Sequence, residues 1–562
     1  MRRLAPLLAL LLAAGCLGAP ASEPPGRDEA AQPFALAPPE RLAFTMSDGV
    51  VLDAVAWRPE GLARAPVVLH ATPYASVCTP HAPDAPYPKP CAPELADEFW
   101  LDEYHGLPRA LVASGYTWLE LSVRGTGASG GCFVYLSERE RKDLGEVLDQ
   151  LAAPESTDGI AMLGLSYMSI TAVEAMIERP GLLKAVVIGG VSLDEYTYFH
   201  TPQGAASVGG GIGWLGWYSA VAGVPFTSPR GTEAYAKRAC PDTATVTLLP
   251  LDHALDERPR EHYLERRYLD RLRGHATGVL VLQGLLDRGA GQQVEPLWPA
   301  LEGTPRALVL GHWEHHFPDD ALLQGSGLGW PELPLAWLDH HLRGGPAPDL
   351  LGEVRAHVVG DAWRTYEAWP PGPQEALYLG ATLGREPASG GLSFRLAPGA
   401  RACDDAPGTW AVALSEPLAA DALLVGNPMA WLEVTSTSAS ATVAVDLWDV
   451  PGDDVCEAAL LSYGAADLRF RDDPFVGRDV PVGQTLGTRI DMHAVASLVP
   501  AGHRLAVTLS SAGEHGAAGR PGVGTIALGG GSHILLPTAS GVGAPLPGIA
   551  YPPRPLDADW RG

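Results

Sequence analysis

IAMLGLSYMSITAVEAMIE, residues 160–178, is the stretch of this sequence that decides the fold. IAMLGLS opens it as a short apolar run, which predicts a buried strand that ends at Ser166. TAVEAMIE closes it and predicts a helix. In the turn between them, GLSYMS, the residues that flank the serine must be small, because the turn is tight and lifts the Ser166 hydroxyl above the sheet edge. The pattern favours a nucleophile elbow with Ser166 as its nucleophile.

The elbow motif by itself is a weak signal. The chain has 65 glycines, so chance matches to a Gly-x-Ser pattern are common, and an ordinary strand–helix turn is the alternative. Gly164 supplies the small residue before the serine, but Ser169 stands where a closing glycine is usual. The predicted strand and helix on either side strengthen the elbow reading.

Strand and helix patterns alternate on both sides of this stretch, which predicts an α/β fold with a mostly parallel sheet. Ser137 and Glu140 form a capping-box pattern, and apolar residues then recur at helical spacing, so residues 137–151 are expected to be a helix. Buried strands are predicted at 66–74, 116–123, 183–190, 278–284 and 306–312. We therefore expect one catalytic α/β domain formed by residues 41–190 and 275–350.

Two further regions have a different texture. Residues 191–274 lose the alternation and predict a helical cap, with Trp214 and Trp217 as candidate pocket residues, although aromatic residues in a cap are more often core. The charged run DERPREHYLERRYLDRLR, residues 256–273, is expected to be a solvated helix face. Residues 351–562 are short Val-, Leu- and Thr-rich segments between turns, which predicts an all-β jelly-roll domain.

The N-terminus points to an exported protein. Arg2 and Arg3 precede an apolar run typical of a signal peptide over residues 1–21, and residues 22–40 are a Pro-rich leader. A lipoprotein signal with Cys16 as the lipidated residue is the second reading, a buried helix the third, and a membrane partner is expected only if Cys16 is lipidated. The formal net charge of −26, without a Lys/Arg cluster, excludes a nucleic-acid partner.

Six cysteines remain beyond Cys16, which suggests up to three disulfides in an exported chain. Cys78 with Cys91 is the most plausible local pair, and Cys403 with Cys456 is a possible second one, while the connectivity stays open. No His/Cys spacing reads as a metal site, and no cofactor is predicted.

A serine hydroxyl needs a base to become a nucleophile. In this fold class the order along the chain is Ser, Asp, His, and the acid and the base follow strand ends. Asp287 lies just past the predicted strand 278–284, and His315 lies in GHWEHH, just past the strand 306–312. The order and the positions favour a Ser166–His315–Asp287 triad over a turn aspartate and a helix-capping histidine.

These motifs together resemble the cocaine esterase and X-Pro dipeptidyl-peptidase family of α/β-hydrolases, over nearly the whole mature chain. GLSYMS resembles its elbow, GLLD its acid segment and GHWEH its histidine segment, which selects His315 over His312 and His316. TPYAS resembles the loop whose tyrosine hydroxyl binds the oxyanion. The resemblance therefore implies Tyr74 and the backbone N–H of Tyr167 as oxyanion donors, an acyl-enzyme mechanism and no cofactor. SVRGTGASGG, WLDHHLRGG and GHRLAVTLSSA resemble further family segments.

Three functions remain open at this stage. A carboxylic ester hydrolase acting on small esters or amides is the first, and an X-Pro-type dipeptidyl-peptidase acting on short peptides is the second. The family also includes α-amino acid ester hydrolases, whose acidic residues after the catalytic aspartate are absent here, although Asp194 and Glu195 are possible substitutes. The third reading is a carbohydrate-binding protein with an inactive hydrolase core.

Overall fold

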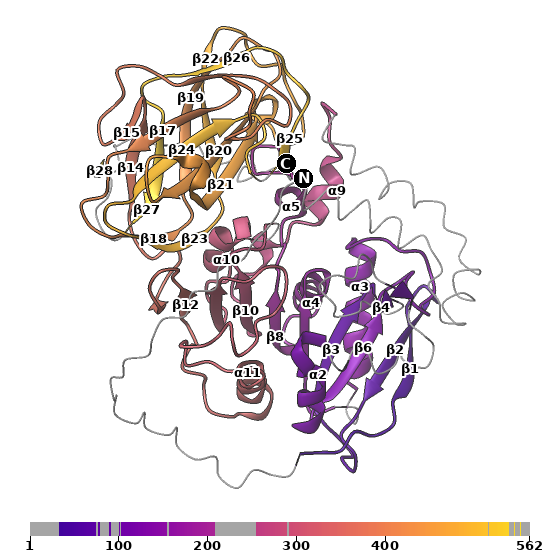
Figure 1. The fold of residues 1–562 in the computed structure, drawn as a ribbon. Helices are drawn as coiled ribbons and strands as arrows, with labels where there is room; N and C mark the ends of the chain where they lie inside the picture. The colour runs from indigo at the N-terminus through magenta and orange to yellow at the C-terminus, as the bar shows by residue number, and fades with distance from the viewer. Residues whose placement is uncertain are drawn as a thin grey trace, which may run out of the picture.

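The computed structural model describes residues 33–551, apart from 75–76, 79–88, 91–100, 102, 154–156, 208–254, 289–290, 515, 539–543 and 546–550. Figure 1 shows an α/β part, and beside it a β-rich part formed by the C-terminal region. No helix in these residues combines the length and the apolar character needed to cross a membrane.

A ten-stranded sheet forms the centre of the α/β part, in the order β1-β2-β6-β3-β7-β8-β10-β11-β12-β13. Neighbours from β6 to β12 in this order run parallel, and the edge strands β1, β2 and β13 are antiparallel to their neighbours. The predicted α/β sheet is confirmed. Its strands are β1 Glu40–Thr45, β2 Val51–Trp57, β3 Val67–Thr72, β6 Thr117–Ser122, β7 Ile160–Leu165, β8 Leu183–Gly189, β10 Gly278–Gly284, β11 Arg306–Gly311, β12 Val354–His357 and β13 Trp363–Tyr366.

Helices cover both faces of this sheet. One hydrophobic core joins the sheet to α3 (Glu138–Leu151), α4 (Tyr167–Glu178) and α10 (Val294–Ala300). A second core, on the opposite face, joins it to α2 (Glu103–Ala113) and α11 (Glu332–Arg343). Helix α3 begins as the sequence predicts, because the Ser137 side chain accepts a hydrogen bond from the backbone N–H of Arg139 at 3.2 Å.

The α/β sheet extends further along the chain than the boundary at residue 350 that the sequence suggests. β12 pairs in parallel with β11, and β13 returns antiparallel beside it, so the sheet ends at Tyr366. These two strands form a short hairpin, whose two-residue periodicity is the same as that of the β-rich region that follows. A sequence pattern alone does not show which sheet such a hairpin joins.

Between residues 191 and 274 the described elements are short: α5 (Glu195–Phe199), β9 (Ala206–Ser207), α9 (Arg260–Glu265) and the 3-10 turn η3 (Leu269–Arg271). Trp214 and Trp217 lie outside the described residues. The expected solvated face of the charged run is wrong in part, because Arg258 and Arg266 are each only 5% exposed. Their partners come from distant segments, such as Glu195 and the backbone carbonyl of Gly204, so no local pattern reveals the burial.

The C-terminal region is a β-rich domain around its own hydrophobic core, as the sequence predicts. A twelve-stranded sheet and the separate pair β18–β23 form it, and β25 pairs with β9. The strands are β14 Gln374–Leu379, β15 Thr382–Gly384, β16 Ser393–Arg395, β17 Ala411–Ser415, β18 Ala422–Gly426, β19 Met429–Ser436, β20 Thr442–Val450, β21 Ala459–Asp467, β22 Thr485–Asp491, β23 Val495–Val499, β24 Arg504–Ser510, β25 Ala517–Ala518, β26 Thr525–Leu528, β27 His533–Pro537 and β28 Ala544–Pro545.

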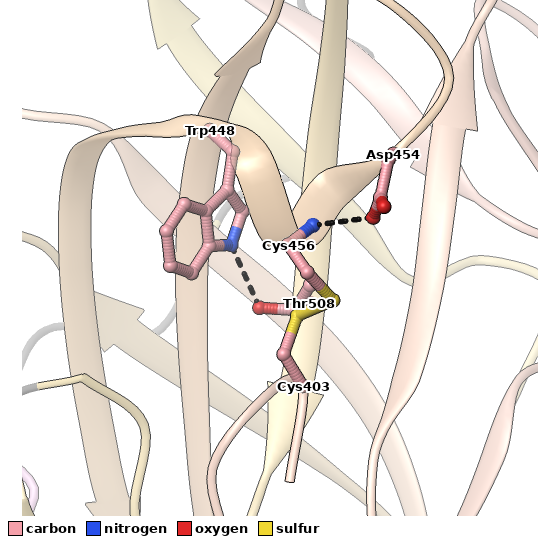
Figure 2. The surroundings of a disulfide bond; sticks show 5 residues. All are labelled: Cys403, Trp448, Asp454, Cys456 and Thr508. Atoms are coloured by element: carbon pink, nitrogen blue, oxygen red, sulfur yellow. Dashed lines mark hydrogen bonds between the residues drawn. A yellow bond between two sulfur atoms is a disulfide. The ribbon is translucent and has the colours of Figure 1, made fainter. Parts of the chain in front are cut away.

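A disulfide joins Cys403 to Cys456 in this domain, as considered from the sequence. Figure 2 shows it near Trp448, whose indole N–H donates to the Thr508 hydroxyl at 2.9 Å. Cys132 is also disulfide-bonded. Cys91 and Cys240 lie outside the described residues, as do Cys16 and the predicted signal peptide.

Candidate active site

Ser166 occupies a sharp turn between β7 and α4. Its backbone has φ 61° and ψ −124°, a combination that costs free energy in a residue with a side chain and that clusters at functional sites. Its N–H donates to the carbonyl of Gly189 on the neighbouring strand at 2.8 Å, which holds the turn against the sheet. A Cβ atom on Gly164 would lie 2.4 Å from Cβ of Met168, so only glycine fits where the helix approaches the strand. The local geometry is that of a nucleophile elbow.

Asp287 and His315 meet across neighbouring strand ends. Asp287 follows β10 and His315 follows β11, and Nδ1 of His315 lies 2.7 Å from Oδ2 of Asp287. The carboxylate is buried, at 5% exposure, and it also lies 3.4 Å from the amide nitrogen of Gln283. The same glutamine accepts a hydrogen bond from the N–H of Val191, so it links the ends of β10 and β8 below the pair.

Of the three histidines in GHWEHH, the structure brings His315 to the aspartate. His312 Nε2 lies 3.3 Å from the carbonyl of Ala496, and His316 Nδ1 lies 2.8 Å from the carbonyl of Phe317. The His315 ring packs over Gly190, where a Cβ atom would lie only 2.8 Å from its Cε1. Gly190 also lines the cavity at Ser166, so the pair and the serine face the same edge of the sheet.

The Asp287 carboxylate makes the His315 imidazole a stronger base. Burial lowers the pKa of His315, but the charge of the Asp287 carboxylate and its hydrogen bond raise it more, and the pKa of His315 is raised overall. An imidazole oriented in this way through Nδ1 presents Nε2 to a substrate or nucleophile, as a general base does.

Tyr74 and Tyr167 lie next to each other above the sheet. Tyr74 follows β3, its N–H donates to the Thr72 hydroxyl at 3.0 Å, and its ring lies edge-on to that of Tyr167 with 6.4 Å between centroids. The Tyr167 hydroxyl donates to both carboxylate oxygens of buried Glu140, at 2.8 and 2.9 Å. This bond fixes the side chain of the residue that follows Ser166 in the chain.

A small cavity opens beside Ser166. It has a volume of about 20 Å³, room for about one water molecule. Tyrosine rings and apolar side chains form most of its wall, and one buried ion pair completes it. Its lining consists of Tyr135, Leu136, Ser166, Tyr167, Ile170, Gly190, Ser192, Glu195, Tyr198, Arg266 and Tyr268.

The ion pair joins Glu195 of α5 to Arg266, whose Nε lies 3.5 Å from Oε2 of the carboxylate. His262 Nε2 lies 3.1 Å from the same oxygen. Arg266 also donates to the carbonyls of Tyr135 at 2.9 Å and of His262 at 2.8 Å. A guanidinium with this many partners tolerates burial, and its charge offsets that of Glu195 at the cavity wall.

Most of the residues that line this cavity were not predicted from the sequence. Arg266 lies in the run expected to be solvated, Glu195 was considered only as a substrate contact, and Tyr135 and Tyr268 stood in no motif. The one signal in the sequence was the pair of tyrosines within the charged run, Tyr263 and Tyr268, because a fully solvated helix is polar on all sides. Within the described part of the chain, no group of three or more His, Cys, Asp or Glu side chains is arranged to hold a metal ion.

The sequence and the fold of this chain are similar to those of known proteins. Residues 48–316 match the model of the X-Pro dipeptidyl-peptidase S15 family, and residues 347–536 match that of the X-Pro dipeptidyl-peptidase C-terminal non-catalytic domain. The cocaine esterase of Rhodococcus sp. is 25% identical over 540 residues, covering 83% of this chain and 89% of its own. A putative Xaa-Pro dipeptidyl-peptidase of Streptomyces avermitilis is 24% identical, covering 83% and 76%. An aminopeptidase structure from a marine sediment Thaumarchaeota archaeon has the same fold, with a TM-score of 0.68, 19% identity and coverage of 91% and 98%.

Proposed function

Because the chain belongs to the cocaine esterase and X-Pro dipeptidyl-peptidase family of α/β-hydrolases and is a serine hydrolase, we propose that Ser166, His315 and Asp287 are its catalytic triad. The observation that carries this proposal is the 2.7 Å contact between His315 Nδ1 and Asp287 Oδ2, at the sheet edge where the strained Ser166 turn stands. Each group follows a different parallel strand, as this reaction class requires.

In the proposed reaction, His315 Nε2 takes the Ser166 hydroxyl proton while Oγ attacks the acyl carbonyl. The tetrahedral intermediate collapses when the imidazolium gives that proton to the leaving alcohol or amine. Water then attacks the acyl-enzyme, with His315 again as base, and releases the acid and free Ser166. Asp287 keeps its charge throughout and stabilises the imidazolium, in agreement with the direction in which it moves the pKa of His315.

We assign the oxyanion to the Tyr74 hydroxyl and the backbone N–H of Tyr167. The first residue of a helix after the nucleophile carries an N–H that the helix itself leaves unused, and its dipole favours a negative charge there. The contact between the rings of Tyr74 and Tyr167 supports the assignment of both donors to one oxyanion site. Loss of one such donor typically lowers kcat by about 10²–10³-fold.

For the substrate, we propose a carboxylic ester with a short acyl group. The small volume of the cavity beside Ser166 supports this choice, because its wall of tyrosines leaves little room for a long chain. Hydrolysis of p-nitrophenyl acetate, butyrate and octanoate tests it, with kcat/KM expected to fall steeply toward octanoate. Equal or rising values along the series would exclude a short acyl pocket.

The triad is tested with matched variants in the same ester assay. Ser166→Ala and His315→Ala are expected to abolish turnover, because nucleophile and base are lost. His316→Ala is the control, since that ring lies on the same loop and bonds the carbonyl of Phe317. Turnover by Ser166→Ala at the wild-type rate would refute the assignment of the nucleophile.

X-Pro dipeptidyl-peptidase activity is the second candidate, favoured by the description of the matched family model and by the Streptomyces relative. Glycyl-prolyl-p-nitroanilide distinguishes the two. Cleavage of the anilide that is lost in Ser166→Ala would make the protein a peptidase, whereas ester cleavage without anilide cleavage supports the esterase.

We also propose that the protein is exported, by a signal peptide over residues 1–21 or as a lipoprotein through Cys16. Disulfide bonding of Cys132 and of Cys403 with Cys456 supports an oxidising compartment. Mass spectrometry of the mature protein tests the proposal. A chain beginning at Ser22 indicates a cleaved signal peptide, a lipid-modified Cys16 indicates the anchored form, and an intact N-terminus in the cytosol would refute export.

A further inference from the structure

One segment of the C-terminal domain touches the loops of both Asp287 and His315. It comprises residues 493–496, which run from the link after β22 into the first two residues of β23. In Figure 1, β18 and β23 lie on the side of the β-rich part that faces α10. From here His493 reaches the acid loop after β10, and Ala496 reaches the loop after β11.

The contact with the acid loop is made by a buried imidazole. His493 is 3% exposed, its Nε2 lies 3.1 Å from the backbone carbonyl of Asp287, and its Nδ1 lies 3.1 Å from that of Ala494. Burial lowers the pKa of His493, so the ring is neutral and donates from one nitrogen only; we assign that N–H to Nε2. The ring fills the space above Gly291, where a Cβ atom would lie 2.0 Å from Nε2. The carbonyl of Asp287 also accepts the N–H of Gly291 at 3.0 Å, so both bonds hold the backbone from which the catalytic carboxylate projects.

His493 is itself held firmly by the β-rich domain. Its N–H donates to the carbonyl of Tyr463 at 2.8 Å, and its carbonyl accepts from the Ser462 hydroxyl at 2.5 Å. The ring of Tyr463 packs against it with 4.8 Å between centroids. The Tyr463 hydroxyl continues to the carbonyl of Arg288, one residue past the acid, at 3.3 Å. The contact therefore comes from a residue that the second domain holds through its backbone and its ring.

The contact with the histidine loop lies three residues further along. The Ala496 carbonyl lies 3.3 Å from Nε2 of His312, three residues before His315. Burial lowers the pKa of His312, so the ring is neutral and donates this N–H. The backbone of Ala496 also accepts the N–H of Val359 at 3.0 Å, which joins the same segment to the end of the α/β sheet.

We propose that residues 493–496 are a positioning element through which the C-terminal domain holds the acid and base loops in register, with His493 as its positioning residue. This inference rests on the triad proposed above and goes beyond it. Asp287 and His315 sit on separate loops, and a displacement of about 1 Å between catalytic groups can cost about 10²-fold in rate. A segment bonded to both loops limits that displacement.

A pair of amide substitutions distinguishes the Nε2 contact of His493 from its Nδ1 contact. Glutamine places an amide N–H near the position of Nε2 and can still reach the Asp287 carbonyl, whereas asparagine places it near Nδ1 and cannot. With p-nitrophenyl butyrate, and with rates expressed per serine titrated by a fluorophosphonate, His493→Gln is expected to keep kcat within about threefold of wild type. His493→Asn is expected to lose at least about tenfold in kcat with KM unchanged, and the acidic limb of its kcat/KM profile should move to lower pH, because the weaker Asp287 contact lowers the pKa of His315.

The proposal would be overturned if His493→Asn and His493→Gln had equal rates per titrated serine and the acidic limb did not move. A role in packing alone would change the amount of folded enzyme but neither of these two measurements. Gly291→Ala is the second variant, should His493→Asn not fold. A Cβ atom on Gly291 would press on the His493 ring, so the same loss in kcat and the same shift are expected from Gly291→Ala. Ser166→Ala, measured in parallel, separates the two proposals. Turnover by Ser166→Ala would refute the triad. If Ser166→Ala is inactive and Gly291→Ala has the kcat and the pH profile of the wild type, only the positioning element is refuted.

Discussion

The hydroxyl of Ser169 donates a 2.6 Å hydrogen bond to the backbone carbonyl of Ser166. Ser169 is fully buried and stands where the elbow motif of the family usually has a glycine. The same carbonyl accepts the N–H of Ser169 at 2.9 Å and that of Ile170 at 3.3 Å. The departure from the motif therefore does not open the turn. It adds a bond to Ser166, the strained residue that we propose as the nucleophile.

Substitution of Ser169 tests this bond. Ser169→Ala is expected to lower the free energy of unfolding by about 0.5–1.5 kcal/mol, the usual net value of one hydrogen bond. Ser169→Val also inserts a branched side chain into a fully buried site, which typically costs about 1–3 kcal/mol. Urea unfolding measures both, and a valine variant as stable as the alanine variant would show that the site has spare room.

The buried and exposed arginines of one charged run offer a matched pair. Arg266→Ala is expected to destabilise the fold by about 3–5 kcal/mol, because it leaves the Glu195 carboxylate, only 4% exposed, without its guanidinium. Arg273→Ala removes an ion pair with Glu302 whose side chains are 68% and 61% exposed, and is expected to cost at most about 1 kcal/mol. Denaturant unfolding at neutral pH compares them, and similar losses would contradict the buried pair.

Stability should depend on pH through Glu140. Burial raises its pKa from 4.5 to about 7, although the bond from the Tyr167 hydroxyl lowers it. A carboxyl group with a raised pKa stabilises the fold below its unfolded pKa, and this contribution is lost as pH rises through the folded pKa. Between about pH 4.5 and 7 the wild type should lose on the order of 3 kcal/mol from this group.

Glu140→Gln removes this titration and keeps an oxygen to accept the Tyr167 hydroxyl. The difference in unfolding free energy between variant and wild type is therefore expected to shift in favour of the variant from pH 5 to pH 8. Burial and the charge of Glu140 raise the pKa of Glu174, so loss of that charge acts in the same direction. A difference that stays constant over this range would show that Glu140 does not carry the titration.

The Asp287 carboxylate should set the acidic limb of activity. Activity needs neutral His315, so kcat/KM rises with pH through the raised pKa of that histidine. Asp287→Asn removes the charge that raises this pKa, so the limb should move to lower pH while kcat falls by about 10⁴-fold. A pH–rate profile of both proteins checks this, with rates corrected for unfolded enzyme. An unmoved limb would mean that another group titrates there.

Local patterns predicted much of the α/β part. Apolar runs marked the strands β3, β6, β7, β8, β10 and β11, and Ser137 marked the start of α3, because these signals depend on neighbours within a few residues. The same patterns did not show that β12 and β13 pair with the α/β sheet, since a hairpin has the same local pattern in either sheet.

The sequence by itself determined the candidate triad, because the order of Ser166, Asp287 and His315 and their places after strands are properties of the chain. Only the tertiary structure decided what surrounds them. Glu195 meets Arg266, Tyr167 meets Glu140, and His493 reaches the Asp287 backbone from another domain. A charged or polar side chain is buried only where a partner compensates its desolvation, and here each partner comes from a distant segment that folding alone brings near.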